Sequence, residues 1–226
     1  MFGMPDSELL LIDKPLGITS FDVIRRLRRI LNIKKMGHAG TLDPLATGLM
    51  IIGVGAGTKK LTGLVKLDKE YIAEVRIGES RLTGDLEGEV LEEKIVKGLT
   101  LEMLETALAT MVGTLTLPVS AYSAIKIDGL EMYKRARRAE KSGEVVTEVP
   151  IREMRVDAAE LLQFKIDGGQ AVATVRFFVG SGTYIRSLAE ELGRLLEYPA
   201  TLQALRRTKV GEFSIEDALT FDELAK

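Results

Sequence analysis

Apolar runs typical of buried strands and of amphipathic helices follow one another irregularly along this chain. The strand-like runs lie at residues 8–12, 49–54, 70–77, 151–156 and 172–179. The helix-like runs begin after a cap at Thr19 or Ser20 and recur at 100–112, 130–142, 187–196 and 215–225. Because no regular strand–helix–strand rhythm connects them, the pattern favours a mixed, mainly antiparallel central sheet with flanking helices and loops. The sequence therefore predicts an α+β fold.

The length of 226 residues is compatible with one or two domains. No linker rich in proline, glycine and serine divides the chain, and no internal repeat is present. A single domain spanning residues 1–226 is expected.

Signals for a membrane or for secretion are missing from the sequence. The longest apolar run, residues 49–54, is less than half as long as a membrane span. The N-terminus lacks the basic and apolar regions of a signal peptide. A cytoplasmic protein that does not bind membranes is expected.

Two residue types that carry much of enzyme chemistry are almost absent. Cysteine does not occur, which excludes disulfides, thiolate nucleophiles, zinc–thiolate sites and iron–sulfur clusters. His38 is the only histidine, so a metal site with several histidine ligands is excluded as well. Chemistry in this chain must therefore use Asp, Glu, Lys, Arg, Ser, Thr or Tyr, and no metal site is expected.

The charges are balanced overall but unevenly distributed. The chain has 31 Lys and Arg against 33 Asp and Glu, a formal net charge of −2. Basic residues cluster at 25–35, 134–138 and 206–209, and acidic residues at 85–93 and 216–223. This segregation gives either one positive face that binds phosphates or several solvated helix faces, and charge alone does not decide between them.

The least ordinary stretch is residues 37–48, which read Gly-His-Ala-Gly-Thr-Leu-Asp-Pro-Leu-Ala-Thr-Gly. Its glycines, threonines and proline predict a turn-rich loop of defined conformation between a helix and a buried strand. Asp43 precedes Pro44, which restricts its backbone to an extended conformation that can project the carboxylate from the loop. The alternative is a common Asp-Pro turn without a chemical role.

The next glycine-rich segment, residues 53–60, does not have the spacing of a phosphate-binding loop. A P-loop that starts at Gly53 needs glycine where Thr58 stands, and one that starts at Gly48 needs lysine where Val54 stands. A dinucleotide-binding fingerprint from Gly53 also needs glycine at position 58. No nucleotide cofactor is predicted.

A third candidate segment, residues 180–188, runs from the end of an apolar strand into a helix. Its Gly-Ser-Gly opening exposes backbone amides near the helix start. Arg186 suits a bidentate bond with a carboxylate or phosphate, and Tyr184 would share its face if the strand continued. The alternative is a strand-end tyrosine followed by a surface arginine.

Four motifs, taken in order, are similar to those of a known family. They are residues 14–20 (Lys-Pro-Leu-Gly-Ile-Thr-Ser), 37–48, 69–71 (Lys-Glu-Tyr) and 182–188 (Gly-Thr-Tyr-Ile-Arg-Ser-Leu). Together they resemble the bacterial tRNA pseudouridine-55 synthase (TruB) family over almost the whole chain, from Leu10 to Phe213. The resemblance implies the pseudouridine synthase fold and an RNA-modifying isomerase, an intramolecular transferase. Such an enzyme converts uridine to pseudouridine at position 55, in the T loop of tRNA, by base flipping and without a cofactor.

The resemblance also implies roles around the reacting uridine. Asp43 would be the catalytic aspartate and would pair with Arg186. Tyr71 would stack on the target uracil and later influence proton removal, while Tyr184 and Arg186 line the pocket.

Further residues are implied to hold the RNA or to support the site. His38 is similar to the family histidine that packs against displaced T-loop nucleotides, and Leu205 stands where the family has an apolar pocket residue. Lys14, with Pro15, belongs to a motif that supports the substrate site. Residues from about 118 to 150 resemble the family's thumb, an insertion that reaches over the RNA.

Two departures from the family pattern change the expected RNA binding. The sequence ends at Lys226, soon after the last of these motifs, so the small C-terminal RNA-binding PUA domain that bacterial members usually carry is expected to be missing. Val179, Gly180 and Ser181 replace the more usual Cys-Ser-Lys, which removes one phosphate-directed positive charge. Weaker or more salt-sensitive binding is expected, with the chemistry retained.

The residues are compatible with the implied reaction, which moves the glycosidic bond from N1 to C5 without redox change and needs no cofactor or metal. An aspartate beside an arginine is ionised at pH 7 and can act as a nucleophile. Attack at the base and chemistry at the sugar both remain open. So do two alternatives, a binding module or tRNA-folding chaperone without catalysis, and the same reaction on another RNA or guided by a separate RNA. The expected partner is the T-arm stem-loop of tRNA rather than DNA, and a monomer is expected.

Overall fold

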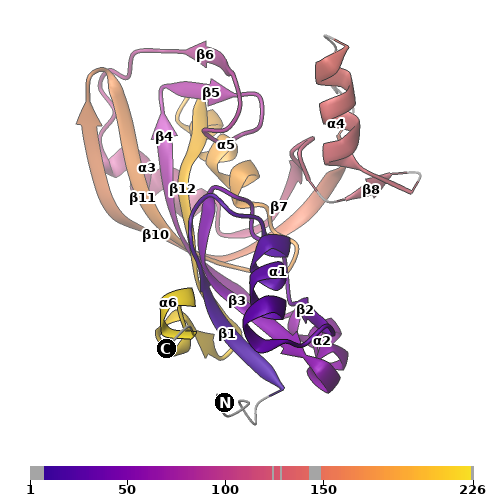
Figure 1. Cartoon of the computed structure of the whole chain (residues 1–226). Helices are drawn as coiled ribbons and strands as arrows, with labels where there is room; N and C mark the ends of the chain where they lie inside the picture. Colours follow the sequence, from indigo (N-terminus) through magenta and orange to yellow (C-terminus); the bar gives the residue numbers. More distant parts are fainter. Residues whose placement is uncertain (1–7, 124, 128, 143–148, 225–226) are drawn as a thin grey trace. The chain divides into compact units, whose positions relative to one another are not determined.

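The computed structural model describes residues 8–123, 125–127, 129–142 and 149–224 (Figure 1). Its strands are β1 (Leu9–Lys14), β2 (Met36–His38), β3 (Ala46–Val54), β4 (Lys69–Ile77), β5 (Glu79–Arg81), β6 (Val90–Glu93), β7 (Gly113–Pro118), β8 (Lys126–Ile127), β9 (Leu130–Glu131), β10 (Ile151–Asp167), β11 (Gln170–Val179), β12 (Ala200–Val210) and β13 (Phe213–Ser214). Its helices are α1 (Ser20–Leu31), α2 (Leu61–Leu64), α3 (Leu101–Thr110), α4 (Met132–Lys141), α5 (Ile185–Leu195) and α6 (Phe221–Leu224), with short 3₁₀ helices η1 (Gly55–Lys59) and η2 (Ile215–Asp217).

The chain forms two compact units. Unit 1 comprises Met1–Ala73, Arg176–Ser181 and Ala204–Lys226, and unit 2 comprises Glu74–Val175 and Gly182–Gln203. Strands β4, β11 and β12 each contribute residues to both units. The expectation of one domain over residues 1–226 therefore stays a prediction.

Strand β3 is the centre of unit 1. Strand β1 pairs with it antiparallel, β2 pairs antiparallel with its C-terminal end, and β12 pairs parallel with its N-terminal end. Leu49, Met50, Ile51 and Ile52 of β3 are fully buried. Such a continuous apolar run is expected for a strand that is covered on both faces. Because β2 pairs with the buried β3, both ends of the loop that connects these two strands are anchored.

In unit 2 the strand order is β12-β4-β11-β10-β7, and β10 pairs antiparallel with β7. Burial alternates along β11, where Ala171, Ala173 and Val175 face the core. Helix α3 contacts β10 and α5, and α5 contacts β7. The helices therefore cover the apolar side of the strands, as expected for a sheet with one buried face.

The predicted fold class is confirmed, because the strand pairs whose registers are resolved are antiparallel except for β3 with β12.

Thr19 caps α1 as expected, in a capping box with Asp22. Helical spacing predicts an inner face of Val23, Leu27, Ile30 and Leu31 for this helix. That prediction is wrong at Ile30, which is 41% exposed, while Ile24 is buried. Residue 24 lies one turn from the other buried positions, so it belongs to the same stripe.

Two other predictions of secondary structure are wrong. Strand β12 was not expected, although it is one of the central strands. The helix expected at 215–225 is replaced by η2, an extended stretch and the short α6, with residue 225 outside the described residues. Leu219 explains the interruption, because its backbone bonds to Leu11 and Asp13 of β1 instead of continuing a helix.

The chain between β7 and β10 leaves the sheet and returns to nearly the same point. Pro118 is opposite Ile151 in the β7–β10 register, and the backbone N–H of Val119 donates to the carbonyl oxygen of Pro150 at 2.9 Å. Between these ends the structure describes β8, β9 and α4, while residues 124, 128 and 143–148 of the expected thumb lie outside the described residues. No helix among the described residues is long and apolar enough to cross a membrane.

Candidate active site

The β2–β3 loop that carries Asp43 is tied to the segment before and at the start of α1. The hydroxyl of Ser20 donates to the carbonyl oxygen of Leu42 at 2.9 Å and accepts from the Leu42 N–H at 2.8 Å. The N–H of Gly17 donates to the carbonyl oxygen of Pro44 at 2.9 Å. These bonds fix the backbone on both sides of Asp43, so the half-buried carboxylate stands on a rigid loop.

Lys14, the last residue of β1, is a fully buried cation. Its ammonium donates to the carbonyl oxygens of Ile18 at 2.7 Å, Pro15 at 3.0 Å and Pro44 at 3.5 Å. A buried charge without such partners is costly, so these bonds stabilise both the charge and the loop. The contacts agree with the supporting role implied for the motif of Lys14, and its contribution to substrate binding stays a prediction.

Gly48 allows β12 to lie close to β3. Its φ is +104°, and a Cβ at this position would lie 2.3 Å from the carbonyl oxygen of Arg207. The same parallel register places Leu205 opposite Ala46, at the end of the Asp43 loop. Gly48 is therefore needed for the pairing that brings Leu205 to the loop.

We expect Gly48→Ala to lower the free energy of unfolding by at least about 2 kcal/mol, because it adds both a backbone clash and an unfavourable φ. Urea unfolding followed by circular dichroism measures this change. Gly63→Ala is the matched control, because Gly63 lies in α2 with open space around its Cβ position. Equal unfolding midpoints for the two variants would contradict the prediction.

The basic cluster at 206–209 is not a free phosphate-binding face. Arg207 is 1% exposed, and its guanidinium donates to the carbonyl oxygens of Leu49 at 2.8 Å and Gly40 at 3.4 Å. Arg206 pairs with Asp13 at 2.7 Å. Lys209, the third cation of the cluster, has a carboxylate oxygen of Glu70 at 3.6 Å. Through its bonds to Gly40 and Leu49, Arg207 connects the β2–β3 loop to strand β3. Sequence analysis missed this structural role.

His38 is half-buried on β2, in register with Ile52. Burial lowers its pKa from the ordinary value, and the positive charge of Arg207 lowers it further. His38 is therefore neutral at pH 7, which suits packing against nucleotides better than pairing with phosphates. Its contact with RNA stays a prediction.

Tyr71 lies on β4 and is only 7% exposed. Two residues earlier on the same strand face, Lys69 is also buried and donates to the carbonyl oxygens of Val65 at 2.7 Å and Leu67 at 2.6 Å. It also donates to the hydroxyl of Ser181 at 3.3 Å, at the position where the family usually has lysine. Lys69 thus connects strand β4, which carries Tyr71, to the segment that follows α2 and to Ser181, all within unit 1.

Burial lowers the pKa of Lys69 to about 8, with the positive charge of Arg207 acting in the same direction. The unfolded chain holds the Lys69 proton up to its ordinary pKa near 10.5, so it binds more protons than the folded state between pH 8 and 10.5. Stability from this group therefore rises with pH across that window. We expect wild type to gain about 1–2 kcal/mol relative to Lys69→Met between pH 7 and 9.5 in urea unfolding. A pH-independent difference between the two proteins would contradict this assignment.

In unit 2, Arg186 lies in the first turn of α5 and is 6% exposed. Its guanidinium donates to the carbonyl oxygens of Thr83 at 3.0 Å and Tyr122 at 3.1 Å, and to the hydroxyl of Ser120 at 3.3 Å. Tyr184 is the N-cap residue of the same helix. Arg186 is thus a buried, multiply bonded cation, and the alternative of a surface arginine is wrong.

Asp85 is a charged partner of Arg186 that sequence analysis did not single out. It is 3% exposed, and its carboxylate lies 3.6 Å from the Arg186 guanidinium. The carboxylate also accepts bonds from the Thr83 hydroxyl at 2.5 Å and the Glu87 N–H at 3.1 Å. In the sequence, Asp85 stands at the start of an acidic stretch and directly after Gly84. A glycine at this position was the local signal for a turn, and the structure shows that turn, with a φ of +73° at Gly84.

Comparison with known proteins decides the family. Residues 28–185 match the model of the TruB family pseudouridylate synthase (N terminal domain), and residues 186–226 match the tRNA pseudouridylate synthase B C-terminal domain. The chain belongs to the TruB family. The predicted family and its enzyme class, an isomerase, are confirmed.

Two curated relatives of this TruB family member carry the same name. The chain is 43% identical to tRNA pseudouridine synthase B of Corynebacterium efficiens, over 97% of this chain and 72% of that protein. It is 41% identical to the protein of the same name from Paenarthrobacter aurescens, over 97% of this chain and 70% of that protein.

Solved structures agree with the fold. A Cbf5–Nop10–Gar1 complex contains a chain that matches 96% of this one with a TM-score of 0.71 and 26% identity. An archaeal box H/ACA Nop10–Cbf5 complex gives a TM-score of 0.66 at 25% identity, again over 96% of this chain. This TruB family member spans about half the length of those solved chains, 53% and 52%.

The structure distributes the predicted TruB site residues over both units. Unit 1 brings Lys14, His38 and Leu205 to the loop of Asp43, by the bonds and strand registers described above. Unit 1 also contains Tyr71, whereas Tyr184 and Arg186 belong to unit 2. The expected pairing of Arg186 with Asp43 therefore stays a prediction.

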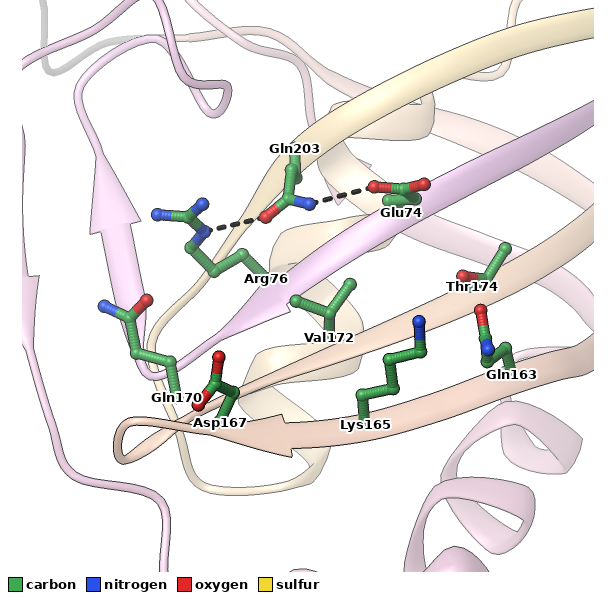
Figure 2. Close-up of a pocket in the computed structure, with 9 residues that line it drawn as sticks. All are labelled: Glu74, Arg76, Gln163, Lys165, Asp167, Gln170, Val172, Thr174 and Gln203. Carbon is green, nitrogen blue, oxygen red and sulfur yellow. Dashed lines mark hydrogen bonds between the residues drawn. The ribbon is translucent and has the colours of Figure 1, made fainter.

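Unit 2 also has a polar cavity of about 310 Å³ (Figure 2). In it, the Arg76 guanidinium donates to the Gln203 amide oxygen at 2.9 Å, and the Gln203 amide nitrogen donates to Glu74 at 2.9 Å. The other lining residues are Gln163, Lys165, Asp167, Gln170, Val172 and Thr174. None of the predicted site residues lies there, and the residues described contain no group of three or more acidic or histidine side chains able to hold a metal ion.

Proposed function

We propose that this TruB family member isomerises uridine to pseudouridine at position 55, in the T loop of tRNA, and that it does so in the cytoplasm. The observation that carries the proposal is Asp43 on a loop fixed by Lys14, Gly17 and Ser20, within the motif where the family has its catalytic aspartate. The tRNA substrate follows from the curated relatives, which are named tRNA pseudouridine synthase B.

In the proposed reaction, the ionised carboxylate of Asp43 either adds to the uracil ring or acts at the sugar beside the bond that breaks. In both routes the N1–C1′ bond breaks, the base rotates and a C5–C1′ bond forms. The proton on C5 leaves and N1 gains a proton, so substrate and product have the same composition and no electrons are transferred. The reaction therefore requires no redox cofactor.

Access to the glycosidic bond requires the uridine to leave the base stack, which costs roughly a few kcal/mol. Stacking on Tyr71 would recover part of this cost, since one base–aromatic stack contributes roughly 1–3 kcal/mol. Tyr184 and Arg186 would complete the pocket, and Leu205 would supply an apolar wall. His38 would pack against the displaced loop nucleotides.

Tyr71→Phe tests the separate role of the tyrosine hydroxyl. The ring is retained, so we expect the Kd for T-arm RNA to stay within about threefold of wild type. Loss of the hydroxyl should lower kcat by about 100-fold, the order of magnitude of general acid–base assistance. Single-turnover kinetics and filter binding measure the two values. A parallel loss in kcat and affinity would instead make Tyr71 a mainly structural residue.

Around the site, we propose that the RNA is held by its shape and its phosphates. The exposed cations of α1 and α4 supply positive charge, and the segment from about 118 to 150 acts as a thumb over the RNA. The closely spaced ends of that segment, where Val119 bonds to Pro150, support its description as an insertion. The partner is the T-arm stem-loop, with the protein acting as a monomer.

The direct test is tritium release from a T-arm hairpin labelled at C5 of uridine, with no added metal or cofactor. Release at the target uridine by the purified chain supports the proposal. Unrelated stem-loops labelled in the same way test specificity, because release from them at equal rates would contradict the T-arm assignment. Tight binding of the hairpin without tritium release would favour a tRNA chaperone over an enzyme.

A further inference from the structure

Two apolar side chains beside the Asp43 loop are left in solvent. Leu16 is 65% exposed and Phe21 is 57% exposed, the largest exposures among the large apolar residues described in unit 1. Phe21 is also the only phenylalanine among the exposed large apolar residues of the described chain. Single exposed leucines are common on proteins, but two such residues bordering a candidate active-site loop call for an explanation.

Phe21 and Leu16 are each next in sequence to a residue that is hydrogen-bonded to the Asp43 loop. Phe21 follows Ser20, whose hydroxyl holds both backbone groups of Leu42. Leu16 precedes Gly17, whose N–H holds the carbonyl oxygen of Pro44. The backbone that presents Leu16 and Phe21 is therefore as firmly placed as Asp43 itself.

The charges around Phe21 favour RNA as the occupant of this surface. The Arg25 guanidinium lies over the Phe21 ring, 5.7 Å from its centre, and is itself paired with Asp22. Arg29, farther along the same helix, is also exposed, whereas the Arg26 guanidinium lies over the ring of Phe221, 5.2 Å from its centre. An aromatic ring next to several cations is the combination that binds single-stranded nucleic acid, with stacking for bases and positive charge for phosphates.

We propose that Leu16 and Phe21 form a platform for an unpaired nucleobase of the substrate RNA, next to the uridine that Asp43 acts on. The platform binds the base by stacking on Phe21 and apolar contact with Leu16, while the α1 cations contact the adjoining phosphates. This inference rests on the proposed function, because it assigns a neighbouring nucleotide of the same RNA. It adds a binding determinant to the site without a role in the chemical steps.

The test combines protein variants with modified RNAs. Phe21→Ala should raise KM and Kd for the T-arm hairpin roughly 5- to 100-fold with kcat unchanged, the range expected for one lost base stack. Phe21→Trp, which retains an aromatic ring, should bind like wild type. Leu16→Ala should also raise the Kd, because the apolar contact with the base is lost. Leu91→Ala is its control and should leave the Kd unchanged, because Leu91 is similarly exposed, at 63%, but lies in unit 2.

Hairpins with a single abasic nucleotide, placed in turn at each loop position, identify the stacked base. For one of these RNAs the difference in Kd between wild type and Phe21→Ala should disappear, because there is no base left to stack. An unchanged Kd for Phe21→Ala, or the same Kd ratio on every abasic RNA, would overturn the platform. Tritium release by wild type separates the two proposals, because the platform can fail while turnover persists, and Kd still tests the platform if turnover is absent.

Discussion

Replacing Asp43 with Asn is expected to lower kcat for T-arm RNA at least about 1000-fold while leaving the Kd within a few-fold of wild type. The amide has nearly the same size, but it carries no charge and is not a nucleophile. The loop should hold its shape, because Ser20, Gly17 and Lys14 bond to its backbone and these bonds remain in the variant.

Tritium release in single-turnover conditions measures the loss, and filter binding measures the Kd. Asp167→Asn is the matched control, because Asp167 is an exposed carboxylate at the end of β10 and should keep full activity. Residual turnover of Asp43→Asn within about tenfold of wild type would exclude the carboxylate as the catalytic group. A large loss of RNA affinity would show instead that Asp43 acts mainly in binding.

The parts of the fold that were predictable from sequence depend on local patterns. Strand β4 was identified by its alternation, because a strand with one buried face repeats every two residues. One face is Tyr71, Ala73, Val75 and Ile77, and the other is Ile72, Glu74 and Arg76. Thr19 identified the start of α1, because its side chain and Asp22 satisfy backbone groups only a few residues away. Neither signal requires knowledge of a distant partner.

Strand β12 was not predictable in this way. It carries Arg206, Arg207 and Lys209, a pattern that the sequence presents as a basic surface cluster. Arg207 is buried because the carbonyl oxygen of Leu49, which is far away in sequence, satisfies its guanidinium. The identity of the central strand therefore depends on non-local bonds, which a window of sequence does not contain.

In the candidate site, too, local sequence patterns were predictable and contacts between distant residues were not. The sequence of residues 37–48 was distinctive enough to identify the loop of Asp43, but not the cations that hold it. Lys14 was assigned to the site by motif, whereas its three carbonyl partners are seen only in the structure. Asp85 was hidden in an acidic stretch, because its burial comes from packing with Arg186 across about a hundred residues of chain.

The second large effect is expected for Arg186→Lys, which keeps the positive charge but removes the planar fork. The guanidinium reaches the carbonyl oxygens of Thr83 and Tyr122 at the same time, with Asp85 as a charged neighbour. A lysine ammonium has a single nitrogen and leaves at least one of these buried acceptors unsatisfied, at a cost of about 1–3 kcal/mol. We expect kcat to fall about 100-fold, because the loop ends that Arg186 joins would shift relative to α5.

Two measurements separate this effect from a general loss of stability. Arg194→Lys on the same helix is the control, because Arg194 is exposed and its guanidinium, among the residues described, bonds to Glu191 alone. Turnover is measured well below the unfolding temperature of Arg186→Lys, where circular dichroism shows the variant to be folded. If the folded variant keeps kcat within about threefold of wild type, the positive charge of residue 186 is sufficient and the fork geometry has no role in turnover. If kcat falls while Arg194→Lys is unaffected, turnover depends on the planar guanidinium at position 186 and not on its positive charge alone.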